Sequence, residues 1–231
     1  FKDLDFMLIA KSGRVIYDKE EYINFQEKIE YVDFPTFQSL HNEINKTKSD
    51  KSLIDITFAG TLDINYRNPL LLLESLKLTK QKIRLNIFGK GNCDDIFNQF
   101  KNIDSLQIVQ HGTVTRDKVI KAMLESDFLV NITNEIDDAV PSKIFEMFGT
   151  GKPILNLSFK KDDVTTDYFK KYPSVFTIKA WEALEEQISY LNEFLAEEYG
   201  KTYNMDDIKE KFIQNTPEYT VDIITKKIVN N

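Results

Sequence analysis

Residues 54–89 read IDITFAGTLDINYRNPLLLLESLKLTKQKIRLNIFG, and this stretch carries the pattern that decides the fold. Residues 54–59 form a short apolar run that ends at Gly60. Asn68 and Pro69 then open a leucine-rich helix, with Asn68 as its cap. Residues 83–88 form a second short apolar run, which ends at Gly89. A strand, a helix and a strand in succession indicate a βαβ unit.

The same alternation continues along the chain to residue 178. Four more strands are predicted over residues 106–109, 128–132, 154–157 and 175–178, with a helix before each over residues 93–100, 115–125, 141–148 and 164–172. Such units wind right-handed into a parallel sheet with helices on both faces. We therefore predict an α/β fold, a doubly wound parallel sheet of about six strands, followed by helices from residue 181 to residue 229.

The residues before this pattern are organised differently. Residues 4–10 and 28–33 read as strands, with a mixed, helical segment over residues 14–25 between them. Residues 41–52 are polar and lysine-rich, which is typical of a linker or an exposed helix end. We predict that residues 1–37 are the remnant of an N-terminal domain with its linker, and that residues 38–231 form the doubly wound domain. Because the chain starts at Phe1, we interpret it as a part of a longer protein.

Composition narrows the possible partners. The 231 residues are 42% hydrophobic and 29% charged, so the chain has enough apolar residues to fold. Its single cysteine, Cys93, excludes an internal disulfide. With 30 basic and 37 acidic residues, the net charge of −7 argues against non-specific binding of nucleic acid. No apolar run approaches the roughly 20 residues that a membrane-spanning helix needs.

In an open parallel sheet, ligands bind beyond the carboxyl ends of the strands. Gly60 would let a ligand approach the backbone there, and Arg67 could neutralise a phosphate, although an ordinary loop with a solvated arginine fits as well. Residues 89–91 read Gly-Lys-Gly and lack the third glycine of the dinucleotide fingerprint. The sequence therefore argues against an NAD-binding site here. His111 follows the next strand, either as a ligand donor or as a surface histidine.

The most specific stretch is DDAVPSKIFEMFGTGKPI, residues 137–154. The helix that begins near Pro141 and Ser142 offers free N–H groups and the positive end of its dipole to an anion. Ser142 and Lys143 add donors, and Glu146, one turn further, could accept both hydroxyls of a ribose. A capped helix with a solvated acid and base is the alternative.

This stretch resembles the donor-binding signature of family-4-type glycosyltransferases with the GT-B fold. Glu146 and the Gly-x-Pro at residues 151–153 match its second half. Asp138, eight positions before Glu146, stands where the family often has Glu. The family's usual Gly-Phe-Gly after the first acid is absent, and Ala139-Val140-Pro141 stands there.

Other landmarks fall in the family's order. Residues 58–62 resemble a Gly-Arg-Leu loop near the diphosphate, with Thr61 where Arg is common, and Arg67 stands near a usual Lys. Residues 88–91 and 111–114 also match. The resemblance implies the Rossmann-like, nucleotide-sugar-binding C-terminal domain of a bacterial GT-B enzyme. The donor-binding residues that it implies are Gly60, Thr61, Arg67, His111, Asp138, Ser142, Lys143 and Glu146.

The resemblance also implies an activity. A sugar would pass from a nucleotide-diphosphate sugar to a glycan or lipid-linked acceptor, with retention, without a metal ion, and in the synthesis of a surface polysaccharide. We expect a cytoplasmic location or attachment to the inner face of the membrane. Catalytic groups would lie partly in the N-terminal domain, so we expect this chain alone to bind donor weakly and not to turn over. Two alternatives stay open: a nucleotide-sugar epimerase of the same fold, and a non-catalytic interaction domain.

Overall fold

The computed structural model describes residues 3–40, 53–134 and 140–229. Its main sheet has six strands in the order β5-β4-β3-β6-β7-β8, and every neighbouring pair is parallel. The predicted doubly wound α/β fold is therefore confirmed. The strands of this sheet are β3 (Leu53–Ala59), β4 (Lys82–Phe88), β5 (Leu106–Gly112), β6 (Phe128–Ile132), β7 (Ile154–Ser158) and β8 (Val175–Lys179).

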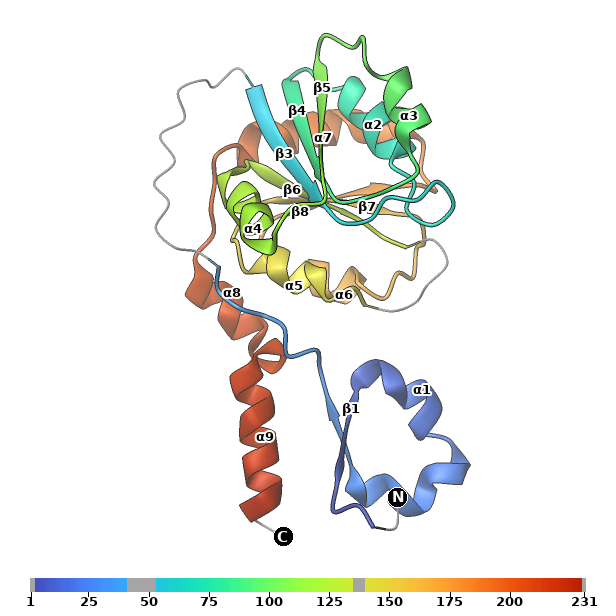
Figure 1. Ribbon diagram of the computed structural model, residues 1–231, viewed down its shortest axis with the longest axis vertical. Helices are drawn as coiled ribbons and strands as arrows, with labels where there is room; N and C mark the ends of the chain where they lie inside the picture. The colour runs from blue at the N-terminus through green and yellow to red at the C-terminus, as the bar shows by residue number, and fades with distance from the viewer. Residues whose placement is uncertain (1–2, 41–52, 135–139, 230–231) are drawn as a thin grey trace.

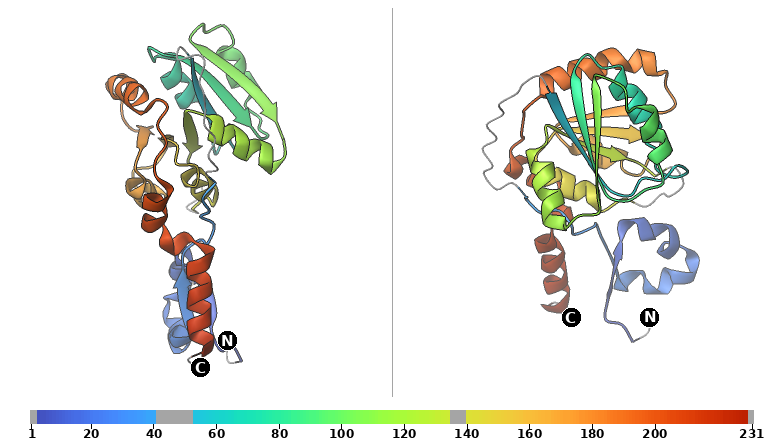
Figure 2. Two further views of the ribbon diagram at one scale, coloured as in Figure 1. Left: turned by 90° about the vertical axis from the view of Figure 1, so that its left-hand side faces the viewer. Right: turned by 45° about the horizontal axis from the view of Figure 1, so that its top comes forward.

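Helices cover both faces of this sheet (Figures 1 and 2). On one face lie α2 (Leu70–Lys77), α3 (Asp94–Gln99) and α7 (Leu184–Glu198), whose apolar residues share one buried cluster. On the other face lie α4 (Arg116–Glu125), α5 (Lys143–Phe148) and α6 (Thr166–Lys171), whose apolar residues belong to a second cluster. The last helices are α8 (Met205–Lys211) and α9 (Pro217–Val229).

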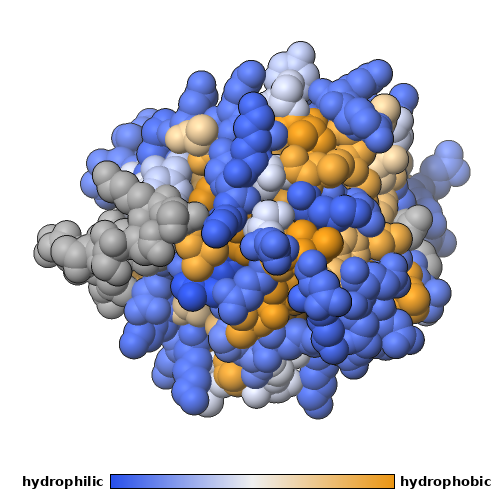
Figure 3. Space-filling model, turned by 90° about the horizontal axis from the view of Figure 1, so that it is seen from above, coloured by the Kyte–Doolittle hydropathy of each residue, from blue (hydrophilic) through white to orange (hydrophobic). Residues whose placement is uncertain are grey.

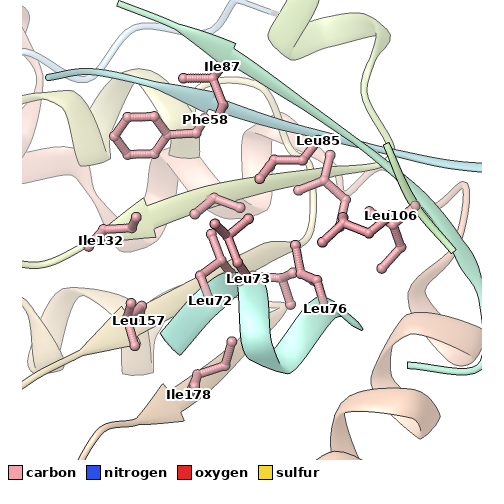
Figure 4. Packing of buried hydrophobic residues seen from close by; sticks show 14 of the residues in the cluster. Phe58, Leu72, Leu73, Leu76, Leu85, Ile87, Leu106, Ile132, Leu157 and Ile178 are labelled. Atoms are coloured by element: carbon pink, nitrogen blue, oxygen red, sulfur yellow. The ribbon is translucent and has the colours of Figure 1, made fainter. Parts of the chain in front are cut away.

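The first cluster follows from the alternation along the strands. On β3, Ile56 and Phe58 point toward α2, and Thr57 between them points to the opposite face, where it bonds Ser126. Figure 4 shows the leucines of α2 facing side chains from β4, β5, β6, β7 and β8. The labelled residues are Phe58, Leu72, Leu73, Leu76, Leu85, Ile87, Leu106, Ile132, Leu157 and Ile178.

Aromatic rings dominate the second cluster. Phe148, at the end of α5, is fully buried. Its ring stacks on Tyr172 and on Phe212, with 4.7 Å between ring centroids in both pairs. Phe145 and Phe169 meet the Phe148 ring edge-on. This packing fixes α5 against α6 and against Phe212, the residue that follows α8.

The N-terminal segment forms a separate unit beside the main sheet. Strands β1 (Met7–Ala10) and β2 (Ile29–Val32) pair in parallel, and α1 (Arg14–Tyr17) lies between them in the chain. Short 3₁₀ turns complete the secondary structure at Lys11–Gly13, Glu20–Lys28 and Ile213–Asn215. Figure 1 shows this unit and α9 extending from the same end of the main domain. Lys227 Nζ on α9 lies 3.2 Å from Glu30 Oε2 on β2. The domain boundary at residue 37 stays a prediction.

The segment that leaves β2 is anchored to the main domain through Asp33, Phe37 and Leu40, whose N donates to Gly149 O at 2.7 Å. Asp33 Oδ1 accepts hydrogen bonds from the Tyr168 hydroxyl on α6 and from Phe34 N, both at 2.8 Å. Burial and the hydrogen bond to Asp33 raise the pKa of Tyr168 above its ordinary value. Further on, Phe37 N donates to Asn215 O at 2.9 Å, and the Phe37 side chain is buried.

Replacing Tyr168 with phenylalanine removes one partner of a buried carboxylate. Asp33 is 7% exposed, so we expect a loss of about 1–2 kcal/mol in the free energy of unfolding. Urea denaturation measures this loss. Tyr190→Phe is the matched control, because Tyr190 is 63% exposed, and its stability should stay unchanged. Equal stabilities of the two variants would contradict the anchoring role.

Some predicted helix starts differ in detail. The α2 helix begins one residue after Pro69, yet the Asn68 side chain still accepts from Leu70 N at 2.9 Å. Thr115 precedes α4 in an extended conformation, but its side chain makes no capping hydrogen bond. The α5 helix begins at Lys143 rather than at Pro141.

The molecular surface carries both apolar and hydrophilic side chains. Seen from above, an apolar area is bordered by hydrophilic side chains (Figure 3). In the described ranges, no helix combines the length and the apolarity that crossing a bilayer requires. Exposed apolar side chains include Leu70 and Leu78, near the two ends of α2.

Candidate functional site

The order of the strands places a crevice between β3 and β6. From β3 the chain adds β4 and β5 on one side, then returns to add β6, β7 and β8 on the other. The connections to β4 and to β6 therefore leave on opposite faces of the sheet. At such a switch point the loops beyond the carboxyl ends diverge and leave room for a ligand.

Two loops at this edge are joined through their backbones. Gly60 N donates to Phe88 O at 2.9 Å, and Leu62 N donates to Lys90 O at 3.0 Å. Gly89 has a φ of +138°, and a Cβ atom there would stand 1.9 Å from Gly60 O. Glycine at position 89 therefore permits the close approach of the two loops. Gly91 then pairs with Leu62 in an isolated parallel bridge, so residues 89–91 run alongside residues 60–62.

Arg67 folds back onto the loop that starts at Gly60. Its Nη1 lies 3.4 Å from Thr61 O, a long contact. Its buried Nε has no hydrogen-bond partner among the described residues. Burial lowers the pKa of the Arg67 guanidinium, because desolvation disfavours the charged form. An anion placed beside Thr61 would supply the charge and the acceptor that this side chain lacks.

The α5 helix brings a cation and an acid to the end of β3. Lys143 Nζ lies 3.4 Å from Ala59 O, the last residue of β3. Lys143 and Glu146 line a narrow crevice together with Ala59 and with residues of β6 and α4. Ser142 stands just before the helix, exposed, and its side chain makes no capping hydrogen bond. The predicted contributions of Lys143 and Glu146 thus meet at one place, next to Gly60.

Glu146 has a partner that sequence reasoning missed. Its Oε1 accepts from Arg116 Nη2 at 2.9 Å and from Arg116 Nε at 3.1 Å. Arg116 is the first residue of α4, thirty positions earlier in the chain, and no motif marks it. The Glu146 side chain is 27% exposed, so its second oxygen can still meet a ligand. The Arg116 guanidinium holds the carboxylate at the mouth of the crevice.

His111 lies away from Lys143 and Glu146. Its Nε2 is 3.0 Å from Asn86 Oδ1 on β4, and its ring stacks on Phe88 with centroids 4.2 Å apart. These contacts fix the ring over β4 rather than over the switch point. Asp138, the other predicted acid of the signature, lies outside the described residues.

Comparison with known proteins identifies the fold. No family model matches the sequence, and no curated protein matches it. Solved structures do match. The apo form of the lipopolysaccharide outer core galactosyltransferase WaaB superposes with a TM-score of 0.65, at 16% identity over 98% of this chain. HepE from Anabaena, solved with UDP, gives a TM-score of 0.64 at 10% identity over 98% of this chain. TarM gives 0.60 at 13% identity over 99%.

The main domain of this chain has the fold of a GT-B domain. The strand order and the helices on both faces are those expected of a Rossmann-like domain of that fold. The chain spans 62% of the length of WaaB, 64% of HepE and 43% of TarM. At these levels of identity the GT-B likeness shows how the chain folds, and the chemistry has to be argued from the residues at the switch point.

Proposed function

We propose that this chain is the nucleotide-sugar-binding part of a glycosyltransferase. The observation that carries the proposal is the convergence of Lys143 and Glu146 on the end of β3, beside Gly60, at the switch point of the sheet. Ligands bind at that place in folds of this kind. HepE, which shares the fold, has been solved with UDP and with UDP-glucose.

Each side chain of the site has a proposed part in binding. Glu146 accepts hydrogen bonds from the ribose hydroxyls, and Arg116 keeps its carboxylate oriented. Arg67 and Lys143 face the diphosphate, with the Gly60–Thr61 backbone allowing its approach. Sugar transfer releases a nucleoside diphosphate, and fixed cations stabilise the charge that develops on this leaving group. Ser142 and His111 are assigned to the donor by resemblance, as is Asp138.

The reaction itself is proposed on the same resemblance. A hexose would pass with retention to a glycan or lipid-linked acceptor in surface polysaccharide synthesis. The charge of the leaving group would be met by side chains rather than by a metal ion. The acceptor and part of the catalytic machinery would belong to a partner N-terminal domain, so this chain alone should bind donor weakly without turnover. A cytoplasmic enzyme, free or at the inner face of the membrane, fits such substrates.

Replacing Glu146 with alanine should weaken nucleotide binding about 30-fold. The change removes hydrogen bonds between a carboxylate and hydroxyls, and a loss of about 2 kcal/mol corresponds to this factor. Isothermal titration calorimetry with UDP, GDP, ADP and CDP measures the loss and names the preferred base. Stability should change little, since the Glu146–Arg116 pair is partly exposed.

The control for this experiment is Glu125→Ala. Glu125 is a partly exposed glutamate at the end of α4, paired with Lys121 at 3.9 Å, and it does not line the crevice. Its loss should leave the affinity unchanged. Equal affinities of the wild type and the Glu146→Ala variant would contradict the ribose contact. Failure of every nucleotide to bind would favour the interaction-domain alternative.

A further inference from the structure

A second cavity lies on the face of the sheet that α6 covers, at the carboxyl ends of β7 and β8. Its volume is about 300 Å³. It is lined by the last residues of the two strands, Ser158 and Lys179, and by Thr166 and Lys170 of α6. The residues that line it and those that line the crevice at Glu146 do not overlap. The cavity is therefore a place in the fold that the proposed nucleotide site does not use.

The charge of this cavity differs from that of the chain as a whole. Three lysines, Lys161, Lys170 and Lys179, line it, and no carboxylate of the described residues does, whereas the whole chain carries a net charge of −7. Lys170 pairs with Asp167 at 3.2 Å, and Lys179 pairs with Glu182 at 2.9 Å. For Lys161 the described part of the chain offers no carboxylate partner. An anion in the cavity would meet this unpaired ammonium.

The remaining lining is suited to a sugar ring. Asn156 and Ser158 are polar and buried, with exposures of 4% and 3%. Asn156 Oδ1 accepts from Asn131 Nδ2 at 2.7 Å, and Ser158 Oγ donates to Lys160 O at 3.0 Å. Asn156 Nδ2, by contrast, makes a long contact of 3.5 Å with Thr177 Oγ1. The Asn156 amide and the Ser158 hydroxyl oxygen can therefore still meet a ligand. Trp181 adds an aromatic ring, partly exposed, and Phe169 adds a buried one. A pocket that combines an apolar wall with a few fixed polar groups holds a polar ring in one orientation.

We propose that this cavity binds a saccharide that carries an anionic group, either a phosphate or a carboxylate. Lys161 receives the charged group, with Lys170 and Lys179 nearby. The ring lies against Trp181, and its hydroxyls meet the amide and hydroxyl groups on β7 and β8. The site is separate from the nucleotide site, and the proposal does not depend on the identity of the donor.

The chain supplies its own reporter for this site. Trp181 is the only tryptophan among the 231 residues, so tryptophan fluorescence reports from the rim of this cavity alone. Titration with glucose 6-phosphate and with glucuronate should give a saturable change in emission. Glucose should give none at the same concentrations. Tighter binding of glucose 6-phosphate would mean that the cavity recognises a phosphate. Tighter binding of glucuronate would mean that it recognises a carboxylate.

Two variants test the role of the unpaired ammonium. Lys161→Ala should weaken binding of the anionic sugar at least about fivefold, the effect of losing one charge-assisted contact. Lys118→Ala, at an exposed lysine on α4, should leave the affinity unchanged. The proposal is overturned if neither anionic sugar gives a saturable change or if both variants bind as the wild type does. An equal response to inorganic phosphate would mean an adventitious ion only and would overturn it as well.

Discussion

Replacing Gly89 with alanine is expected to destabilise the protein by at least about 3 kcal/mol. A side chain at φ +138° is forced into a backbone region that only glycine occupies readily, at a cost of roughly 1–3 kcal/mol. The new Cβ atom would also stand 1.9 Å from Gly60 O, so the backbone has to move. Because that backbone borders the candidate site, nucleotide affinity should fall with stability. Urea denaturation and calorimetry measure the two losses.

Gly112→Ala is the matched control for this prediction. Gly112 also has a positive φ, +67°, but a Cβ atom there meets nothing within 4 Å. Its alanine variant should lose only about 1–2 kcal/mol, the cost of the left-handed conformation. If the two variants are equally stable, the contact between the loops of β3 and β4 does not constrain the fold as described.

Replacing Phe148 with alanine should cost about 3–5 kcal/mol, because it removes a fully buried ring and leaves a cavity. The total free energy of unfolding of a domain is about 5–15 kcal/mol. The expected loss at Phe148 therefore removes a large part of the stability of the folded state. The ring holds α5 against Tyr172 and Phe212, and α5 carries Lys143 and Glu146. We therefore expect weaker nucleotide binding even under conditions where the variant is folded.

A leucine at the surface provides the comparison. Leu78, at the end of α2, is 46% exposed, and Leu78→Ala should change the free energy of unfolding by less than about 1 kcal/mol. Urea denaturation of both variants gives the difference. A loss at Phe148 no larger than the loss at Leu78 would contradict the aromatic packing around α5.

Most of the fold could be predicted from local patterns. Apolar runs such as residues 54–59 and 83–88 are short, and glycines end them, so strand positions were predicted to within a few residues. The alternation with helices predicted a parallel sheet. The order of the strands could not be predicted, because it depends on which side of β3 each unit packs, and no local pattern records that choice.

The candidate site could be predicted only in part. Lys143 and Glu146 were found because they follow one strand within one motif. The ion pair between Arg116 and Glu146 joins residues thirty positions apart and leaves no local signal. The strand before His111 was predicted to end at residue 109, but β5 continues to Gly112, so His111 lies within the strand. Its side chain turns to Asn86, which depends on side-chain packing alone.

The most direct test of the proposed nucleotide site is the amide chemical-shift map of this chain on titration with UDP and with GDP. This measurement detects weak binding and places it on the sequence. We expect the largest shifts at Gly60 and Thr61, just after β3, and at Lys143 and Glu146 on α5, with one of the two nucleotides. Shifts that are absent with both nucleotides, or that fall away from these residues, would contradict a nucleotide site at the switch point.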